Sequence, residues 1–165
     1  MTGVGAPDGS WHPEIERKWL LDGVPERLRE LAPVEIEQGW LPGDPPIRLR
    51  RERSAGAVRL LRTEKRGFGA NRIEREEDLV ATEFDALWPE TAAQRIYKWR
   101  WRVPVGALCW EIDEFRDRTL VLAEVELPAA DTSVSLPDWL APHVVSEVTD
   151  DRAYLNFNLA LSAPC

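Results

Sequence analysis

Charged residues at alternate positions are the feature that most limits how this chain can fold. In Glu14-Ile15-Glu16-Arg17-Lys18, the first, third and fifth residues share one face if the segment is a β-strand. The pattern predicts a mainly β chain, with a few short helices, in which acidic and basic residues share one face. The same alternation recurs in Arg48 and Arg50; Thr63 and Lys65; Arg72, Glu74 and Glu76; Lys98, Arg100 and Arg102; Glu111 and Asp113; and Glu124 and Glu126.

Short alternating runs separated by turn residues divide the chain into expected elements. Helices are predicted at residues 25–31, where Pro25 suits a first helical position, and at 82–88, which Pro89 ends. About eight strands are predicted, at residues 14–20, 34–41, 47–53, 58–65, 71–78, 94–103, 107–115 and 121–127. We expect residues 1–12 to be a flexible lead-in, 13–160 a single domain and 161–165 a C-terminal tail.

The charged face allows two architectures. In the first, it is the solvated outer surface of a sandwich, whose core would contain Ile15, Leu49, Trp99, Trp101, Ile112 and Val125. A solvated face usually mixes charges with uncharged polar residues, whereas here nearly every position of that parity is charged. This favours the second architecture, a closed antiparallel β-barrel with a charged interior. Its outward apolar surface must be covered by the short helices, by the termini or by a second copy in a homodimer.

Composition limits the partners. The formal net charge of −8 argues against general affinity for nucleic acid or for an anionic membrane, although a local basic pocket can exist in an acidic protein. No apolar run approaches membrane-spanning length. Cys109 and Cys165 form no disulfide framework, so we expect a cytoplasmic protein. His12 and His143 lack a metal-binding partner at a suitable spacing and are predicted to be surface residues.

A set of short motifs follows in one order along nearly the whole chain. It begins with Glu14-Ile15-Glu16-Arg17-Lys18 and continues with Gln38-Gly39-Trp40-Leu41, Ile47-Arg48-Leu49-Arg50, Thr63-Glu64-Lys65, Arg72-Ile73-Glu74-Arg75-Glu76, Trp110-Glu111-Ile112-Asp113-Glu114-Phe115 and Leu122-Ala123-Glu124-Val125-Glu126-Leu127. The set resembles the CYTH family, also called triphosphate tunnel metalloenzymes, whose signature is E-x-E-x-K. The resemblance is to the short, single-domain bacterial members.

This resemblance implies a closed antiparallel tunnel of about eight strands. It also implies a metal-dependent hydrolase that cuts the terminal phosphoanhydride of a triphosphate, with inorganic triphosphate as the preferred substrate and nucleoside or thiamine triphosphate as the less favoured alternatives. Two alternatives stay open. Some family members are adenylate cyclases, in which the ribose 3′-hydroxyl attacks the α-phosphate. The basic residues could instead belong to a non-catalytic module that binds polyphosphate or phosphoproteins.

Two pairs of carboxylates are the expected metal ligands. Two carboxylates about 7 Å apart on one face repel by roughly 2.5 kcal/mol at an effective dielectric constant of 20, so such a face favours a divalent cation. Carboxylate oxygens suit Mg²⁺ or Mn²⁺. By resemblance, the ligands are Glu14, Glu16, Glu124 and Glu126.

The resemblance also assigns residues to substrate binding and catalysis. The phosphates are expected to contact Lys18, Arg48, Arg50, Lys65, Arg72, Arg100, Arg102 and Arg152. The expected catalytic residues are Lys18, Lys98, Asp113 and Glu76. The two lysines would polarise water or stabilise the leaving phosphate, and the two carboxylates would orient the arginines or the water. Two alternatives remain: Lys98 pairs with a nearby carboxylate, and Arg102 is a solvated strand end. Glu74, Glu111 and Tyr154 are further candidates near the site.

Overall fold

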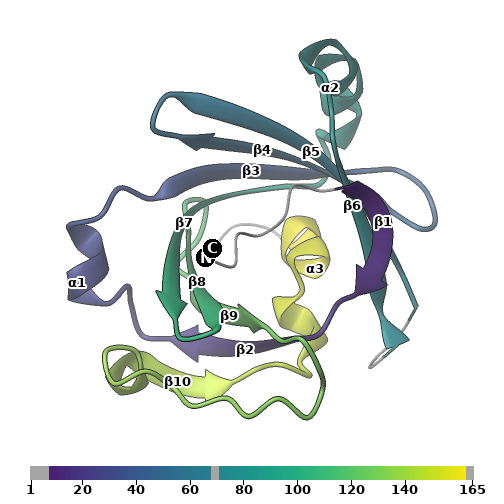
Figure 1. Ribbon diagram of the computed structural model, residues 1–165. Helices are drawn as coiled ribbons and strands as arrows, with labels where there is room; N and C mark the ends of the chain where they lie inside the picture. Colours follow the sequence, from purple (N-terminus) through teal and green to yellow (C-terminus); the bar gives the residue numbers. More distant parts are fainter. Residues whose placement is uncertain (1–7, 68–70, 163–165) are drawn as a thin grey trace.

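The computed structural model describes residues 8–67 and 71–162, which form one ten-stranded sheet with short helices around it (Figure 1). The strands are β1 (Asp8–Pro13), β2 (Glu16–Leu21), β3 (Val34–Leu41), β4 (Ile47–Ser54), β5 (Ala57–Arg66), β6 (Ile73–Asp78), β7 (Arg95–Val105), β8 (Leu108–Phe115), β9 (Val121–Glu126) and β10 (Val144–Glu147). The α-helices are α1 (Glu26–Arg29), α2 (Ala81–Leu87) and α3 (Asn156–Leu161). Short 3₁₀ helices are η2 (Trp88–Thr91), η3 (Ala141–His143) and η4 (Arg152–Tyr154).

The strand order is β1-β6-β5-β4-β3-β7-β8-β9-β2-β10, and the neighbouring strands pair antiparallel. The predicted mainly β, antiparallel class is therefore confirmed. The eight-stranded closed barrel is not confirmed, because the sheet has ten strands and no ladder between described residues joins its two ends. The two added strands are β1, which begins Asp8-Gly9-Ser10 like a turn, and the four-residue β10.

The chain itself brings the two ends of this strand order together. β1 pairs with β6 and β2 pairs with β9, yet β1 and β2 follow each other directly in sequence. At the junction, the Glu14 N–H donates to the Arg72 carbonyl over 2.9 Å. The Leu127 N–H donates to the Ile15 carbonyl over 2.7 Å. Residues 14–15, which join β1 to β2 and which we call the seam, are therefore hydrogen-bonded to the chain next to β6 and to the chain next to β9.

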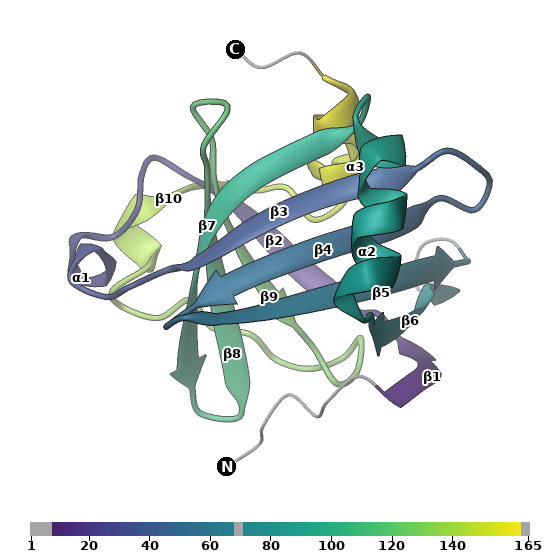
Figure 2. The same cartoon turned by 90° about the horizontal axis from the view of Figure 1, so that it is seen from above.

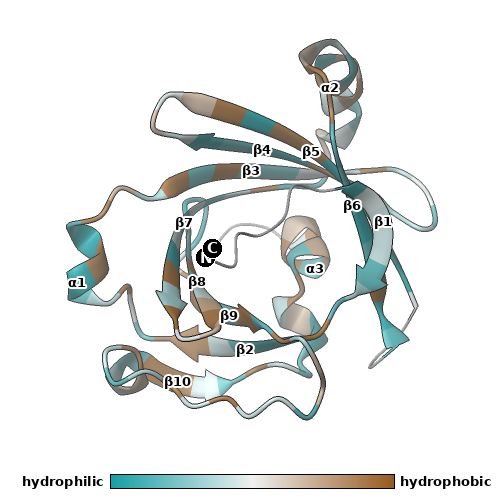
Figure 3. Cartoon of the chain, viewed as in Figure 1, coloured by the Kyte–Doolittle hydropathy of each residue, from teal (hydrophilic) through white to brown (hydrophobic). Residues whose placement is uncertain are grey.

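The registers confirm that the alternating charges share one face. Lys18 lies opposite Glu124 and Arg100 lies opposite Asp113, while the next pairs along these ladders, Trp19 with Ala123 and Trp101 with Ile112, are apolar. Figure 3 shows hydrophobic and hydrophilic bands alternating along the strands. Most of these charged side chains are buried or half-buried, so the charged face is not the solvated surface of a sandwich.

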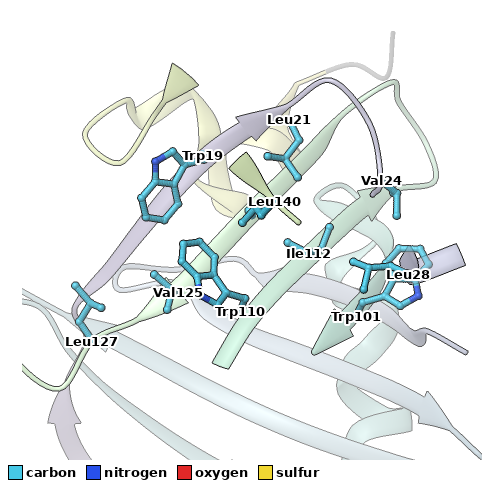
Figure 4. Packing of buried hydrophobic residues seen from close by; sticks show 11 residues of the cluster. Trp19, Leu21, Val24, Leu28, Trp101, Trp110, Ile112, Val125, Leu127 and Leu140 are labelled. Carbon is cyan, nitrogen blue, oxygen red and sulfur yellow. The ribbon is translucent and has the colours of Figure 1, made fainter. Parts of the chain in front are cut away.

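The main apolar cluster lies on the opposite face of β2, β8 and β9 (Figure 4). Trp19 and Trp110 pack with ring centroids 5.1 Å apart, and Leu28 of α1 and Leu140 are fully buried against the same cluster. Trp101 joins them, and its indole N–H donates to the Leu31 carbonyl over 3.0 Å. Each such side chain contributes about 1.5–3 kcal/mol by leaving water. The predicted cover for the outward apolar residues is thus supplied by α1 and the segment 134–144.

Helix α3 fills the space at one end of the charged face. Figure 1 shows strands surrounding α3, and Figure 2 shows it at one end of them. Its Phe157, Leu159 and Ala160 pack against an apolar cluster that includes Trp40 and Phe115. Arg118 Nη1 donates to the Leu159 carbonyl over 2.7 Å and holds the helix in place. The apolar cluster therefore limits how far the charged part of the interior extends.

The chain ends differ in part from the prediction. Residues 8–12 of the expected lead-in belong to β1, and residues 1–7 and 163–165 lie outside the described part of the chain. Trp11 fixes β1 because the guanidinium groups of Arg66 and Arg75 lie 4.4 Å and 5.3 Å from its ring. None of the helices in residues 8–67 and 71–162 combines the length and the hydropathy that spanning a lipid bilayer requires.

Candidate active site

A cavity of about 540 Å³ lies against the charged face of the sheet. Strands β1 to β9 and helix α3 all contribute to its wall. Eight cationic side chains line it: Lys18, Arg48, Arg50, Arg59, Lys65, Arg72, Arg100 and Arg102. Seven acidic side chains line it as well: Glu14, Glu16, Glu74, Glu76, Glu111, Glu124 and Glu126. Positive and negative charges are therefore almost balanced in the cavity wall.

Three carboxylates and one lysine form the wall contributed by β2 and β9. Glu16 lies opposite Glu126 in the register, and Lys18 lies opposite Glu124. Lys18 Nζ lies 3.1 Å from Glu124 Oε1 and 3.8 Å from Glu16 Oε1, and it donates to the Tyr154 carbonyl over 3.1 Å. Burial lowers the pKa of Lys18, but Glu124 and Glu16 outweigh burial and raise it. Lys18 is therefore a fixed cation in this wall.

The carboxylates of this wall are not equally neutralised. Burial opposes ionisation of Glu124, but Lys18, Lys98 and Arg100 hold its pKa well below the usual range. Burial and the neighbouring Glu124 raise the pKa of Glu16. Burial, together with Glu74 and Glu111, raises the pKa of Glu126 to about 7. The cations among the described residues therefore do not fully neutralise Glu16 and Glu126.

The opposite wall presents two buried arginines from β4. Arg50 Nη2 donates to Glu76 over 3.0 Å, and Arg48 Nη2 donates to Thr63 Oγ1 over 3.0 Å and lies 3.4 Å from Glu76. Glu76 therefore fixes both guanidinium groups. Burial and the neighbouring Arg48 lower the pKa of Arg50. The buried Nε of Arg48 has no hydrogen-bond acceptor among the described residues. Both features favour an added anion beside these arginines.

Glu14 is paired with two cations. Lys65 Nζ donates to Glu14 Oε1, and Arg72 Nη2 donates to Glu14 Oε2 over 3.1 Å. Burial would raise the pKa of Glu14, but Lys65, Arg72 and Arg48 outweigh burial and lower it. Like Glu124, Glu14 is thus a predicted metal ligand that the protein's own cations already neutralise, and each of its two carboxylate oxygens accepts a hydrogen bond. Its pairing orients the two predicted phosphate-binding residues.

Beneath the cavity wall, Lys98, Asp113 and Arg100 form a buried ion cluster. Asp113 accepts from Lys98 Nζ over 2.6 Å and from Arg100 Nε and Nη2, each over 2.6 Å. The side chains of Lys98 and Asp113 have no exposed surface, whereas Arg100 also reaches Glu111 and lies 3.3 Å from Glu124. Asp113 therefore orients Arg100. Lys98 and Asp113 do not line the cavity, unlike the other two predicted catalytic residues, Lys18 and Glu76.

The burial of Lys98 gives a pH-dependent stability. Burial, only partly offset by Asp113, lowers the pKa of Lys98 from 10.5 to about 8. Between these two values the unfolded chain binds the proton that the folded protein has released, so the free energy of unfolding rises with pH. We expect this rise between about pH 8 and pH 10.5 in the wild type and its loss in Lys98→Met, measured by urea unfolding at each pH. Equal slopes in both proteins would contradict the prediction.

Two arginines differ in their relation to the cavity. Arg102 lines it and pairs with Glu52 at 2.9 Å and with Glu111 at 3.1 Å, so it is more than a solvated strand end. Arg152 lies in η4, is exposed and is not among the lining residues. The neighbouring Tyr154 reaches the site through its backbone carbonyl, which accepts from Lys18.

Two curated relatives identify the family. No family model matches this chain. An inorganic triphosphatase of Nitrosomonas europaea is 36% identical over 160 residues, which cover 92% of this chain and 99% of the relative. An inorganic triphosphatase of Acetivibrio thermocellus is 30% identical over 152 residues, with coverage of 88% and 92%. The chain belongs to the CYTH, or triphosphate tunnel, family. The predicted family resemblance is thereby confirmed.

Solved structures agree with membership of the CYTH family. The crystal structure of an inorganic triphosphatase matches with a TM-score of 0.63 and 31% identity, over 93% of this chain and 98% of that one. A Bacillus halodurans protein, whose name suggests an adenylate cyclase, matches with a TM-score of 0.50 over 80% of this chain and 97% of its own. It is 14% identical, so this likeness shows the fold alone.

Within this CYTH protein, the remaining acidic residues fit a divalent cation. Glu16 lines the cavity beside Glu124, while Glu126 has no ion-pair or hydrogen-bond partner among the described side chains. Carboxylate oxygens are the ligands that Mg²⁺ and Mn²⁺ prefer. The donor set of Glu16, Glu124 and Glu126 therefore fits the expected metal, and Glu14 is the weakest member of the predicted set.

The sequence motifs of the CYTH family did not reveal every residue of the site. Glu52 was not among the candidates, although its same-face spacing from Arg50 was a usable signal. Gln38 was quoted in a motif but given no role, and its buried side chain lines the cavity. His12 was expected at the surface. It lines the cavity 3.3 Å from Glu74, and no signal in its own segment indicated this because β1 was not predicted.

Proposed function

We propose that this protein is an inorganic triphosphatase, which hydrolyses the terminal phosphoanhydride of triphosphate inside a tunnel lined by the charged face of the sheet. Strands β1 to β9 would curve around the cavity, with residues 14–15 hydrogen-bonded to Arg72, just before β6, and to Leu127, just after β9. The full-length similarity to two curated inorganic triphosphatases supports this proposal.

The near balance of charge in the cavity wall is the observation that supports a requirement for metal. The eight lining cations are matched by seven acidic side chains, so the wall alone offers little net charge to a polyanion. A triphosphate would need added divalent cations to enter it. When bound, Mg²⁺ or Mn²⁺ would neutralise phosphate oxygens and stabilise charge on the attacking and leaving oxygens. Glu16, Glu124 and Glu126 would hold it.

The cations of the wall would bind and orient the phosphate chain. Arg48 and Arg50 would contact one part of it, fixed by Glu76, and Arg100 would contact another, fixed by Asp113. Lys18, Lys65, Arg72 and Arg102 would contribute further contacts from the surrounding strands. A water oxygen would bond to the terminal phosphorus while the opposite P–O bond breaks. Orthophosphate and pyrophosphate would leave, and these cations would stabilise the charge on the leaving pyrophosphate.

The residues that line the cavity also argue against the two alternative functions, a polyphosphate-binding module and an adenylate cyclase. A module that only binds polyphosphate would gain affinity by lacking Glu16, Glu124 and Glu126, which place negative charge against its ligand. A cyclase would need a pocket that recognises adenine, and the cavity end at α3 is instead occupied by Trp40 and Phe157, packed with ring centroids 6.1 Å apart. Hydrolysis is therefore the function that the site supports best.

A substrate comparison tests the proposal. Phosphate release would be measured for inorganic triphosphate, ATP and thiamine triphosphate, each with Mg²⁺, with Mn²⁺ and with a chelator. We expect the highest kcat/KM for inorganic triphosphate and no release with the chelator. Cyclic AMP and pyrophosphate from ATP, without phosphate release, would favour the cyclase. Binding of triphosphate without turnover under any condition would favour the module.

The pKa of Glu126 predicts a pH-dependent requirement for the metal. Protons compete with the cation for a carboxylate whose pKa is about 7. We therefore expect the Mg²⁺ concentration that gives half the maximal rate to rise about tenfold between pH 8 and pH 6. Initial rates over a series of Mg²⁺ concentrations at each pH would measure it. The same requirement at both pH values would contradict the prediction.

Cellular setting and assembly are further parts of the proposal. Cys109 is a free thiol, which suits the reducing cytoplasm. We expect no nucleic-acid or membrane partner for a chain of net charge −8. A homodimer stays a prediction from the sequence.

A further inference from the structure

His12, Glu74 and Glu126 converge on one point where the cavity meets solvent. They come from β1, β6 and β9. Their ligand atoms, one from each side chain, all lie within 4.8 Å of one another. All three residues line the cavity, and the side chain of His12 is 44% exposed. We call this group the histidine cluster.

The seam between β1 and β2 explains why these residues meet. His12 lies directly opposite Glu74 in the β1–β6 register, and its Nε2 lies 3.3 Å from Glu74 Oε1. Two residues later the chain leaves β6, and Glu16 at the start of β2 pairs with Glu126 of β9. The two backbone hydrogen bonds at residues 14–15 hold both neighbours in place. The cluster is thus set by strand pairing, with Trp11 anchoring β1 beside it.

The three side chains form a donor set that includes a nitrogen, whereas the set of Glu16, Glu124 and Glu126 offers oxygen alone. An imidazole nitrogen favours Zn²⁺ and related transition-metal ions over Mg²⁺, while carboxylate oxygens accept either. A Zn²⁺ ion lies about 2.0–2.2 Å from such ligands, which places the ligand atoms roughly 3–4 Å apart. Small side-chain rotations would bring the present separations into that range. Glu126 has no cationic partner among the described residues, so its charge is available to an ion.

We propose that His12, Glu74 and Glu126 form a second metal site, for a divalent transition-metal ion such as Zn²⁺, at the mouth of the cavity. The site goes beyond the proposed triphosphatase activity, because His12 and Glu74 are not needed to explain that activity. Glu126 lies between the two donor sets and is shared by them. Lys65 Nζ, 3.5 Å from Glu74 Oε2, is the cation that faces the cluster, and Glu14 is paired with that lysine.

The chain contains only two histidines, which allows a direct test by NMR. Zn²⁺ would be added to the ¹⁵N-labelled full-length protein while the ring nitrogen resonances are recorded. His143 is an internal control, because its Nδ1 lies 3.0 Å from Asp22 on the surface and it does not line the cavity. The His143→Gln spectrum assigns the resonances. This readout reports on His12 even if Zn²⁺ also binds the thiol of Cys109.

We expect one equivalent of Zn²⁺ to shift the His12 ring nitrogens and to leave those of His143 unchanged, whereas Mg²⁺ shifts neither. Competition with a chromogenic chelator would then show Zn²⁺ affinity about tenfold or more weaker in His12→Gln and Glu74→Gln. His143→Gln and Glu77→Gln are the matched controls, since Glu77 lies on β6 and pairs with Arg62. Unshifted His12 resonances at one equivalent, or equal affinities in His12→Gln and His143→Gln, would overturn the proposal.

Discussion

Replacing Glu16 by Gln is expected to lower the kcat/KM for inorganic triphosphate by at least about 100-fold at a fixed Mg²⁺ concentration. The substitution keeps the size of the side chain and removes one negative charge from the wall that Glu16 shares with Glu124 and Glu126. Burial and Glu124 already raise the pKa of Glu16, so a bound cation would relieve an electrostatic cost at this carboxylate. Steady-state phosphate release over a range of Mg²⁺ and triphosphate concentrations measures the effect.

Glu64→Gln is the matched control for this variant. Glu64 lies on β5, which contributes Thr63 and Lys65 to the cavity, but its own side chain is directed to the other face and pairs with Arg75. We expect the control to keep its turnover within a few-fold of the wild type. Tighter triphosphate binding by Glu16→Gln, with no metal-dependent turnover in the wild type, would instead indicate a binding module.

Replacing Asp113 by Asn is expected to destabilise the fold by about 3–5 kcal/mol. The aspartate side chain is fully buried, and it accepts from both Lys98 and Arg100 at 2.6 Å. Burial opposes its ionisation, but Arg100 and Lys98 outweigh burial and lower the pKa of Asp113. Without this charge, Lys98 has no carboxylate within ion-pair distance among the described residues. Urea unfolding at pH 7 would measure the change in the free energy of unfolding.

The exposed pair of Arg59 and Asp78 provides the comparison. Its atoms lie 3.2 Å apart, but both side chains are more than one-third exposed, so Asp78→Asn should cost less than about 1 kcal/mol. If Asp113→Asn were no more destabilising than Asp78→Asn, the buried cluster would not have the structural role described above.

Much of the fold was predictable because strand parity depends only on local alternation. The position of Glu16, Arg50 and Glu124 on one face follows from the period of two, and pairing in the sheet confirms it. The missing elements have weak local signals. Strand β1 starts with Asp8-Gly9, β10 has four residues, and α3 is too short for a clear helical period.

The face of the sheet on which each site residue lies was predictable, but its depth below the cavity wall was not. Lys98 and Arg100 share the parity of one face, yet only Arg100 lines the cavity. The side chain of Lys98 is fully buried below the cavity wall, where it packs near the ring of Phe115. This burial depends on contacts between distant parts of the chain, which the alternation of charges does not reveal. Arg152 was assigned by motif alone, and the structure places it, exposed, in the short 3₁₀ helix η4. His12 required knowledge of the pairing between β1 and β6.

The most direct test of the central claim is ³¹P NMR of inorganic triphosphate incubated with the wild-type protein, with Mg²⁺ and with a chelator. We predict that the triphosphate signals disappear only with Mg²⁺ and are replaced by orthophosphate and pyrophosphate in equal amounts. Triphosphate that stays intact under both conditions, or that is cleaved equally fast with the chelator, would contradict the proposal of a metal-dependent triphosphatase.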